Sequence, residues 1–129
     1  MRQPWSGAVE SASSGNVANA QAQATFAADA KQLWYLTGLE ITYSGATAAG
    51  VVVATITGLL GGTIDYVVPV PVGVSVGAVP ISVQFGHPLA GAAPNTAIVA
   101  TVPALGSGNT NCVLNIHGFK VSTNGNLLD

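Results

Sequence analysis

From residue 66 to residue 119 the chain contains no Asp, Glu, Lys or Arg. Within this stretch, short runs rich in Val, Ile and Thr alternate with Gly, Pro, Asn and Ser, which is the pattern of β-strands joined by tight turns. Charged residues make up only 6% of the whole chain, against about 25% in ordinary soluble domains. So few charges predict a β-rich subunit whose faces are covered by copies of itself or by a larger assembly.

The hydrophobic pattern predicts seven or eight short strands and no helix. Turn signals separate the strands at the short intervals typical of two packed antiparallel sheets. Two hairpin-like segments echo each other at no fixed period, so a parallel β-helix is disfavoured. We therefore expect an all-β chain, an antiparallel β-sandwich or jelly roll with an extended N-terminal arm. The expected strands are 20–29, 32–43, 51–57, 63–68, 80–85, 95–104 and 110–121.

The strand expected at 32–43 has the clearest alternation. Leu39 and Ile41 fall on one face, which is expected to be core, while Trp34 and Leu36 fall on the other. Gly38 in the middle predicts a bulge or a bend. Trp34 and Leu36 are therefore candidate contacts to a second layer, a neighbouring subunit or a capsid.

Glycine and proline punctuate the second half of the chain. The Gly-rich segment 58–62 predicts a hairpin between the strands on either side of it. Pro69 and Pro71 predict an edge segment or a crossover between sheets, because proline has no N–H to donate. Residues 86–94 are expected to form a loop, and residues 106–109 a turn.

Composition divides the chain into three parts. Residues 1–19 are rich in Ser, Gly, Ala and Asn and cannot fold alone, so they form either a flexible tail or an arm on a neighbouring subunit. Trp5 is the candidate anchor of such an arm. Residues 20–121 form the β-sandwich domain, and residues 122–129 a short C-terminal tail.

Several classes of partner are disfavoured by the sequence. The net charge is −2 and the chain has only three basic residues, which argues against nucleic acid. The single cysteine, Cys112, allows no intrachain disulfide and suits a bacterial cytoplasm. Cys112 and His117 fall on opposite faces of one strand and make a poor metal site. No secretory signal is recognised, and the charge-free run 41–63 is better explained by two strands and a turn than by a membrane helix.

Catalysis is also disfavoured, and no cofactor or small-molecule substrate is expected. Glu40 and Asp65 could pair across strands as the two carboxylates of a glycosidase, but a solvated surface location is the stronger interpretation. His87 or His117 could complete a triad with a serine, yet no nucleophile-elbow motif is present. Each histidine is better explained as a hydrogen-bonding structural residue. The Gly-rich segments lack the Lys-Ser/Thr ending of a phosphate-binding loop.

Several segments resemble small structural proteins of tailed bacteriophages. These are LWYLTGLEITYSGATAAGVVVATITGLLGGT, then PNTAIVATVPALGSGNTN followed by HGF, and the likeness covers about residues 20–120. The resemblance is greatest to head decoration (cement) proteins. It implies a β-rich, often trimeric protein that binds the outside of the capsid where major capsid proteins meet. It carries over no catalytic residues and does not extend to the N-terminal arm.

Two further functions stay open at this point. One is a receptor- or glycan-binding domain of a tail fibre, which would present an exposed aromatic, such as Trp34, beside a tyrosine in an open groove. The other is a different minor head or tail structural role. The favoured expectation is a virion protein on the capsid exterior, made in the host bacterial cytoplasm. Its expected partners are the major capsid protein and further copies of itself, as a homotrimer or another homo-oligomer.

Overall fold

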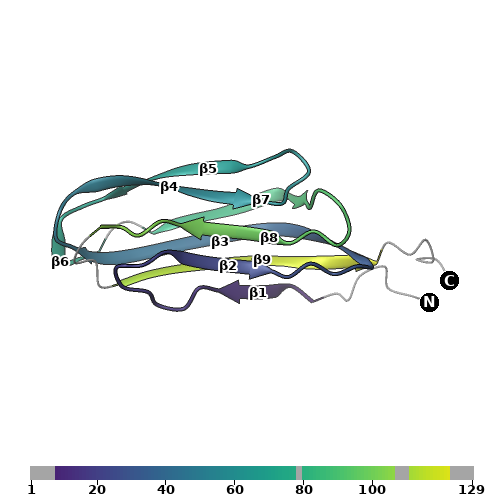
Figure 1. The fold of residues 1–129 in the computed structure, drawn as a ribbon, viewed down its shortest axis with the longest axis horizontal. Helices are drawn as coiled ribbons and strands as arrows, with labels where there is room; N and C mark the ends of the chain where they lie inside the picture. Colours follow the sequence, from purple (N-terminus) through teal and green to yellow (C-terminus); the bar gives the residue numbers. More distant parts are fainter. Residues whose placement is uncertain (1–7, 78–79, 107–110, 123–129) are drawn as a thin grey trace.

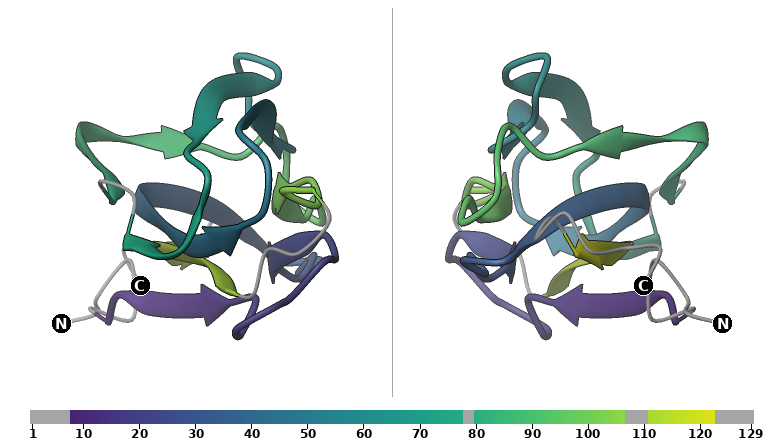
Figure 2. Two further views of the ribbon diagram at one scale, coloured as in Figure 1. Left: turned by 90° about the vertical axis from the view of Figure 1, so that its left-hand side faces the viewer. Right: turned by 90° about the vertical axis from the view of Figure 1, so that its right-hand side faces the viewer.

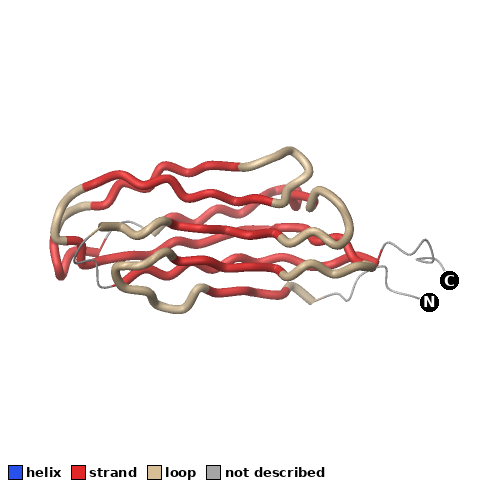
Figure 3. Tube along the Cα trace, in the orientation of Figure 1, coloured by secondary structure: helices blue, strands red, loops and turns tan. Residues whose placement is uncertain are grey.

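The computed structural model describes residues 8–77, 80–106 and 111–122. These residues form strands and loops and contain no helix (Figure 3). The strands make two antiparallel sheets (Figure 1). The strands are β1 (Glu10–Ser13), β2 (Ala22–Phe26), β3 (Gln32–Ala46), β4 (Gly50–Thr57), β5 (Ile64–Val70), β6 (Gly73–Gly77), β7 (Ile81–Ala90), β8 (Ile98–Val102) and β9 (Asn111–Ser122).

The two sheets have different orders. The four-stranded sheet runs β2-β8-β4-β5, and the larger sheet runs β1-β9-β3 and then continues with β6 and β7. β7 pairs with residues 35–41 of β3, and β6 pairs with residues 44–46. Both strands lie on the side of β3 that faces away from β9, so they follow one another along a single edge.

One hydrophobic core takes side chains from both sheets, which enclose it as seen along the molecule in Figure 2. The alternation of buried and exposed residues along β2, β4, β8 and β9 places every second side chain in this core. Burying one such aliphatic side chain contributes roughly 1.5–3 kcal/mol. The largest fully buried side chains are Leu36, Leu39, Ile41, Ile98, Leu114, Ile116, Val68, Val102 and Cys112.

β3 contains a bulge that exchanges the two faces of the strand. Leu36 and Gly38 pair with consecutive residues of β9, which leaves Thr37 as an extra residue. Trp34 and Leu36 are therefore buried on the same side as Leu39. The bulge predicted near Gly38 is confirmed, but the assignment of Trp34 and Leu36 to the opposite face is wrong.

The second half of the chain differs from expectation in two places. β4 and β5 form the predicted hairpin, and Pro69 lies in β5 at the edge of the smaller sheet, as proline requires. However, residues 73–77 form a strand that the pattern did not predict. β7 also continues to Ala90, through most of the segment expected to be a loop. The turn expected at 106–109 falls largely outside the described residues.

The N-terminal segment joins the larger sheet earlier than its composition indicates. β1 pairs with β9, and beyond it the Val17 N–H donates to the Cys112 carbonyl at 3.0 Å. The Asn16 side chain accepts a hydrogen bond from the Cys112 N–H at 3.1 Å. Residues 10–17 thus belong to the larger sheet, although their composition predicts a tail or an arm. Of the expected tail at residues 122–129, Ser122 ends β9, while residues 123–129 and Trp5 lie outside the described residues.

Candidate functional site: an apolar pocket and a charge-poor sheet face

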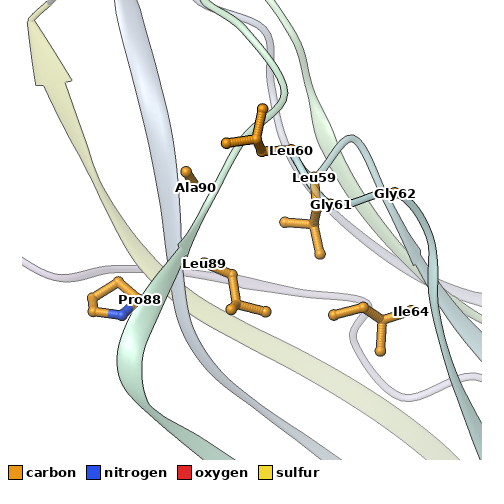
Figure 4. Close-up of a pocket in the computed structure, with 8 residues that line it drawn as sticks. All are labelled: Leu59, Leu60, Gly61, Gly62, Ile64, Pro88, Leu89 and Ala90. Atoms are coloured by element: carbon orange, nitrogen blue, oxygen red, sulfur yellow. The ribbon is translucent and has the colours of Figure 1, made fainter.

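An apolar pocket lies between the β4–β5 turn and the end of β7 (Figure 4). Its volume is about 430 Å³, which lies within the range of small ligand pockets. On one side the Leu60 N–H donates to the Ala90 carbonyl at 2.9 Å, and this contact joins the turn to β7. The residues that line the pocket are Leu59, Leu60, Gly61, Gly62, Ile64, Pro88, Leu89 and Ala90.

The pocket exists because two sheet edges separate here. β5 ends the smaller sheet and β7 lies at the edge of the larger one, and these two strands are not paired with each other. Ile64 from β5 and Leu89 from β7 are only partly buried against the core. Gly61 and Gly62 contribute no side chain, and Gly62 has the positive φ of 98° that makes glycine suitable for this turn. Every lining side chain among the described residues is apolar, so the pocket is suited to binding by apolar burial.

The outer face of the four-stranded sheet is the second candidate surface. Val53 and Val67 lie directly opposite each other in the β4–β5 pair, next to Val51. These three valines are 43%, 66% and 66% exposed, respectively. The remaining outward residues are Gln23, Thr25, Thr55, Thr57, Asp65, Pro69, Val99 and Thr101. Among these described residues the face carries one acidic group and no cation; we call it the valine face.

The larger sheet carries a polar line of three side chains on its outer face. Ser11 Oγ lies 2.8 Å from His117 Nδ1, and His117 Nε2 lies 2.9 Å from Glu40 Oε1. This is the order of a nucleophile, a base and an acid, but all three residues lie on paired strands of an open sheet face. Backbone N–H groups within such a ladder already donate across the strands and are poorly placed to stabilise an oxyanion. The line therefore links β1, β9 and β3, as the hydrogen-bonding role expected for His117 implies.

The three residues proposed as contacts do not come together on a surface. Trp34 is 5% exposed and Leu36 is 0% exposed, so both belong to the core of a single chain. The Trp34 ring stacks on Phe26 with centroids 4.2 Å apart, and its Nε1–H donates to the Ala27 carbonyl at 2.8 Å. Lys120 Nζ lies 5.2 Å from the centre of the same ring. Trp5 is outside the described residues.

The other candidate groups are also dispersed. Glu40 lies on the larger sheet and Asp65 on the smaller one, so they do not form a carboxylate pair. Cys112 is buried and His117 lies on the outer face, as their spacing predicts. Burial raises the pKa of the Cys112 thiol above its ordinary value. Within the described ranges, no three His, Cys, Asp or Glu residues gather where they could hold a metal ion.

Sequence reasoning identified neither the pocket nor the valine face as a site. The valines were recognised only as strand formers, although their alternation in β4 and β5 does indicate which of them point outward. The pocket has no local signal, because its two walls are about 30 residues apart in the chain. In the described part of the chain no helix is long and apolar enough to span a membrane.

The comparison with known proteins found no relative of this chain. No protein family model, curated protein or solved structure matches the chain. The pocket and the valine face are therefore interpreted from their own residues. The pocket is apolar, the valine face exposes three valines, and both involve the β4–β5 hairpin. This hairpin is therefore the candidate contact surface among the described residues.

Proposed function

We propose that this chain is a structural virion protein, a head decoration (cement) subunit that binds the major capsid protein of a bacteriophage as a homotrimer. The observation that carries the proposal is the valine face, where Val51, Val53 and Val67 are exposed and no cation lies on the face among the residues that the structure describes. Contiguous apolar surface of this kind is unfavourable in water and marks a contact with another protein. The proposed location is the exterior of the capsid.

The size of the valine face supports attachment at several points. Four strands of five to eight residues, spaced about 4.8 Å apart, cover roughly 400 Å² of projected area. A stable interface needs about 800 Å² from each partner. One valine face therefore makes a weak contact alone. An oligomer that applies several such faces to a repeating shell binds far more tightly, because the later contacts become intramolecular.

The strand order also supports the proposal, although a fold alone does not determine a function. If β6 and β7 are counted as one interrupted strand, the chain has eight strands, which can be numbered 1 to 8 in chain order. The larger sheet then has the order 1-8-3-6, and the smaller sheet has the order 2-7-4-5. We propose that this is a jelly roll, an architecture used by viral capsid proteins and by lectins. In this order, most consecutive strands lie in different sheets, so the connections between them cross from one sheet to the other.

Co-sedimentation with purified capsids of the parent phage tests the proposal. Wild-type protein is expected to pellet with capsids. Val53→Asp is expected to lose at least tenfold in affinity, because a buried carboxylate without a partner is costly. Thr42→Asp, on the exposed outer face of the larger sheet, is the matched control and should bind as the wild type does. Wild-type protein that stays in the supernatant, or equal binding by both variants, would contradict the proposal.

The glycan-binding alternative is not favoured by any contact in the described residues. It requires an aromatic ring open to a sugar, and Trp34 is instead covered by Phe26 and the core. Tyr35 and Phe119 on the larger sheet stack on each other with centroids 5.2 Å apart, so each ring already uses one face. Binding in a glycan screen together with failure to bind capsids would reverse this ranking.

A further inference from the structure

We propose that the apolar pocket binds Trp5 from the N-terminal segment of a second copy of this chain. The inference rests on the proposed function, since it names the contact that joins subunits of the decoration oligomer. Each chain then offers one pocket and supplies one tryptophan. Such a contact joins two different surfaces and can close into a ring, as a trimer requires.

The pocket suits a tryptophan in size and chemistry. Its volume of about 430 Å³ and its wholly apolar side chains match a large ring that gains free energy by burial. Leu60 at its rim is 70% exposed, the highest exposure of any large apolar side chain described. The chain has two tryptophans, and Trp34 already lies in the core. Trp5 is thus the tryptophan left to fill the pocket.

The position of β1 relative to the pocket follows from the strand register. Glu10 in β1 pairs with Gly118 in β9. Gly118 pairs with Leu36 in β3, and Leu36 pairs with Leu89 in β7. Leu89 lines the pocket. The start of β1 and the wall of the pocket are therefore in one row across the larger sheet, three strand spacings or roughly 14 Å apart.

The reach of the chain decides between a contact within one subunit and a contact between subunits. Val9 is the neighbour of β1, and the four residues back to Trp5 span at most about 14 Å when fully extended. Crossing the sheet uses all of this length. No chain length remains for the segment to turn around β7 and enter the pocket beside Ile64. The Trp5 that fills the pocket must come from another copy.

Charge and backbone constraint agree with this docking. Asp65 follows the pocket residue Ile64, is exposed, and has no ion-pair partner among the described residues. Arg2 is the only arginine of the chain and lies three residues before Trp5. Pro4 restricts the backbone next to Trp5 and lowers the entropy lost on docking. A segment docked in the pocket therefore carries a cation close in sequence to its tryptophan, while Asp65 offers an exposed carboxylate on the outer side of the neighbouring strand position.

Light scattering on mixtures of full-length variants tests the inference. Trp5→Ala removes the ring but keeps the pocket. Gly61→Leu fills the pocket and keeps the ring; the glycine is not at positive φ and a Cβ there meets no atom within 4 Å. Each variant alone is expected to be monomeric, with the dissociation constant raised at least about 30-fold. Mixed in equal amounts, they should form a heterodimer, because the ring of one can enter the pocket of the other.

The control is Gly50→Leu, which is equally free of contacts but lies at the far end of β4. It should keep the wild-type mass. Leu60→Asp at the exposed rim serves as a second pocket variant if Gly61→Leu fails to fold. Circular dichroism establishes that each variant tested is folded. A wild-type monomer at 100 µM, an unchanged mass for Trp5→Ala, or no heterodimer in the mixture would each overturn the inference.

The outcomes separate this inference from the proposed function. If Trp5→Ala keeps the wild-type mass while Val53→Asp still loses capsid binding, the pocket contact is wrong and the decoration role stands. If Trp5→Ala becomes monomeric while Val53→Asp pellets with capsids normally, the oligomer contact is right and docking through the valine face is wrong.

Discussion

Gly118 lies on the inner face of β9, directly beneath the ring of Phe26. A Cβ at this position would approach the Tyr35 carbonyl oxygen to 2.3 Å and Phe26 Cε2 to 2.9 Å. The first of these atoms is backbone and cannot move without disturbing the β3–β9 ladder. Glycine is therefore required here by close packing, and the stack of Phe26 on Trp34 depends on it.

Gly118→Ala is expected to lower the free energy of unfolding by about 1–3 kcal/mol, because the extra methyl group overpacks the core. Gly50→Ala is the matched control. Its Cβ meets no atom within 4 Å, and it should leave stability unchanged or raise it by up to about 1 kcal/mol. Urea unfolding followed by tryptophan fluorescence measures both. Equal midpoints for the two variants would show that the backbone adjusts freely at residue 118.

The buried thiol of Cys112 makes the free energy of unfolding depend on pH in the alkaline range. Burial raises the pKa of its thiol from the ordinary value of 9.0, so the unfolded chain releases this proton at a lower pH than the folded chain. The protonated Cys112 thiol therefore leaves the free energy of unfolding unchanged below about pH 9. As the pH rises further, the free energy of unfolding falls. Burial likewise raises the pKa of Tyr43 from 10.0, which adds a loss at still higher pH.

Cys112→Ala is expected to lose less unfolding free energy between about pH 7 and pH 10.5 than the wild type does, since it removes one of these two groups. Urea titrations at the two pH values give the comparison. The variant will be less stable at pH 7, because it leaves a small cavity, so the difference between the pH values is the quantity that matters. An identical pH dependence in both proteins would mean that Cys112 does not titrate with unfolding.

At the scale of elements, local patterns predicted most strands but not how they are placed. The β4–β5 hairpin could be predicted because both strands and the glycine turn are contiguous in sequence. The faces of β3 could not, since one extra residue at Thr37 exchanges them and a pattern cannot say where it falls. β1 is short and polar, and it becomes a strand only by pairing with β9. The contact of Ser11 with His117 could not be predicted either, because the two residues are 106 positions apart in the sequence. Glu40 and His117 were nevertheless both recognised as candidates.

Deletion of Thr37 is expected to leave the protein folded. It would give β3 a regular alternation, with Trp34, Leu36 and Leu39 still on the buried face. Deletion of Thr42, in the regular part of the same strand, should prevent folding or lower stability by more than about 3 kcal/mol, because it moves one half of the strand to the wrong face. Thermal unfolding of the two deletion variants measures the difference. Similar losses in both would contradict the role assigned to the bulge.

For the whole molecule, the scarcity of charge determines how the proposed assembly responds to its surroundings. The valine face carries Asp65 and no described cation, so docking through it releases few counterions. Affinity for capsids is expected to change less than about threefold between roughly 50 and 500 mM NaCl, because apolar burial is not screened by salt. Sedimentation of capsids with bound protein over this range measures it. A steep fall in binding would instead indicate an ionic interface.

The adjacency of β1 and β9 has a practical consequence. Glu10 opens the first strand and Ser122 closes the last, and the two strands are neighbours in the larger sheet with Glu10 opposite Gly118. The two ends of the described domain therefore emerge side by side from the same end of the molecule (Figure 1). A short peptide bridge could join them, with new termini opened in the exposed loop at residues 47–49. Such a rearranged chain would display foreign sequences at the end of the molecule opposite to Glu10 and Ser122.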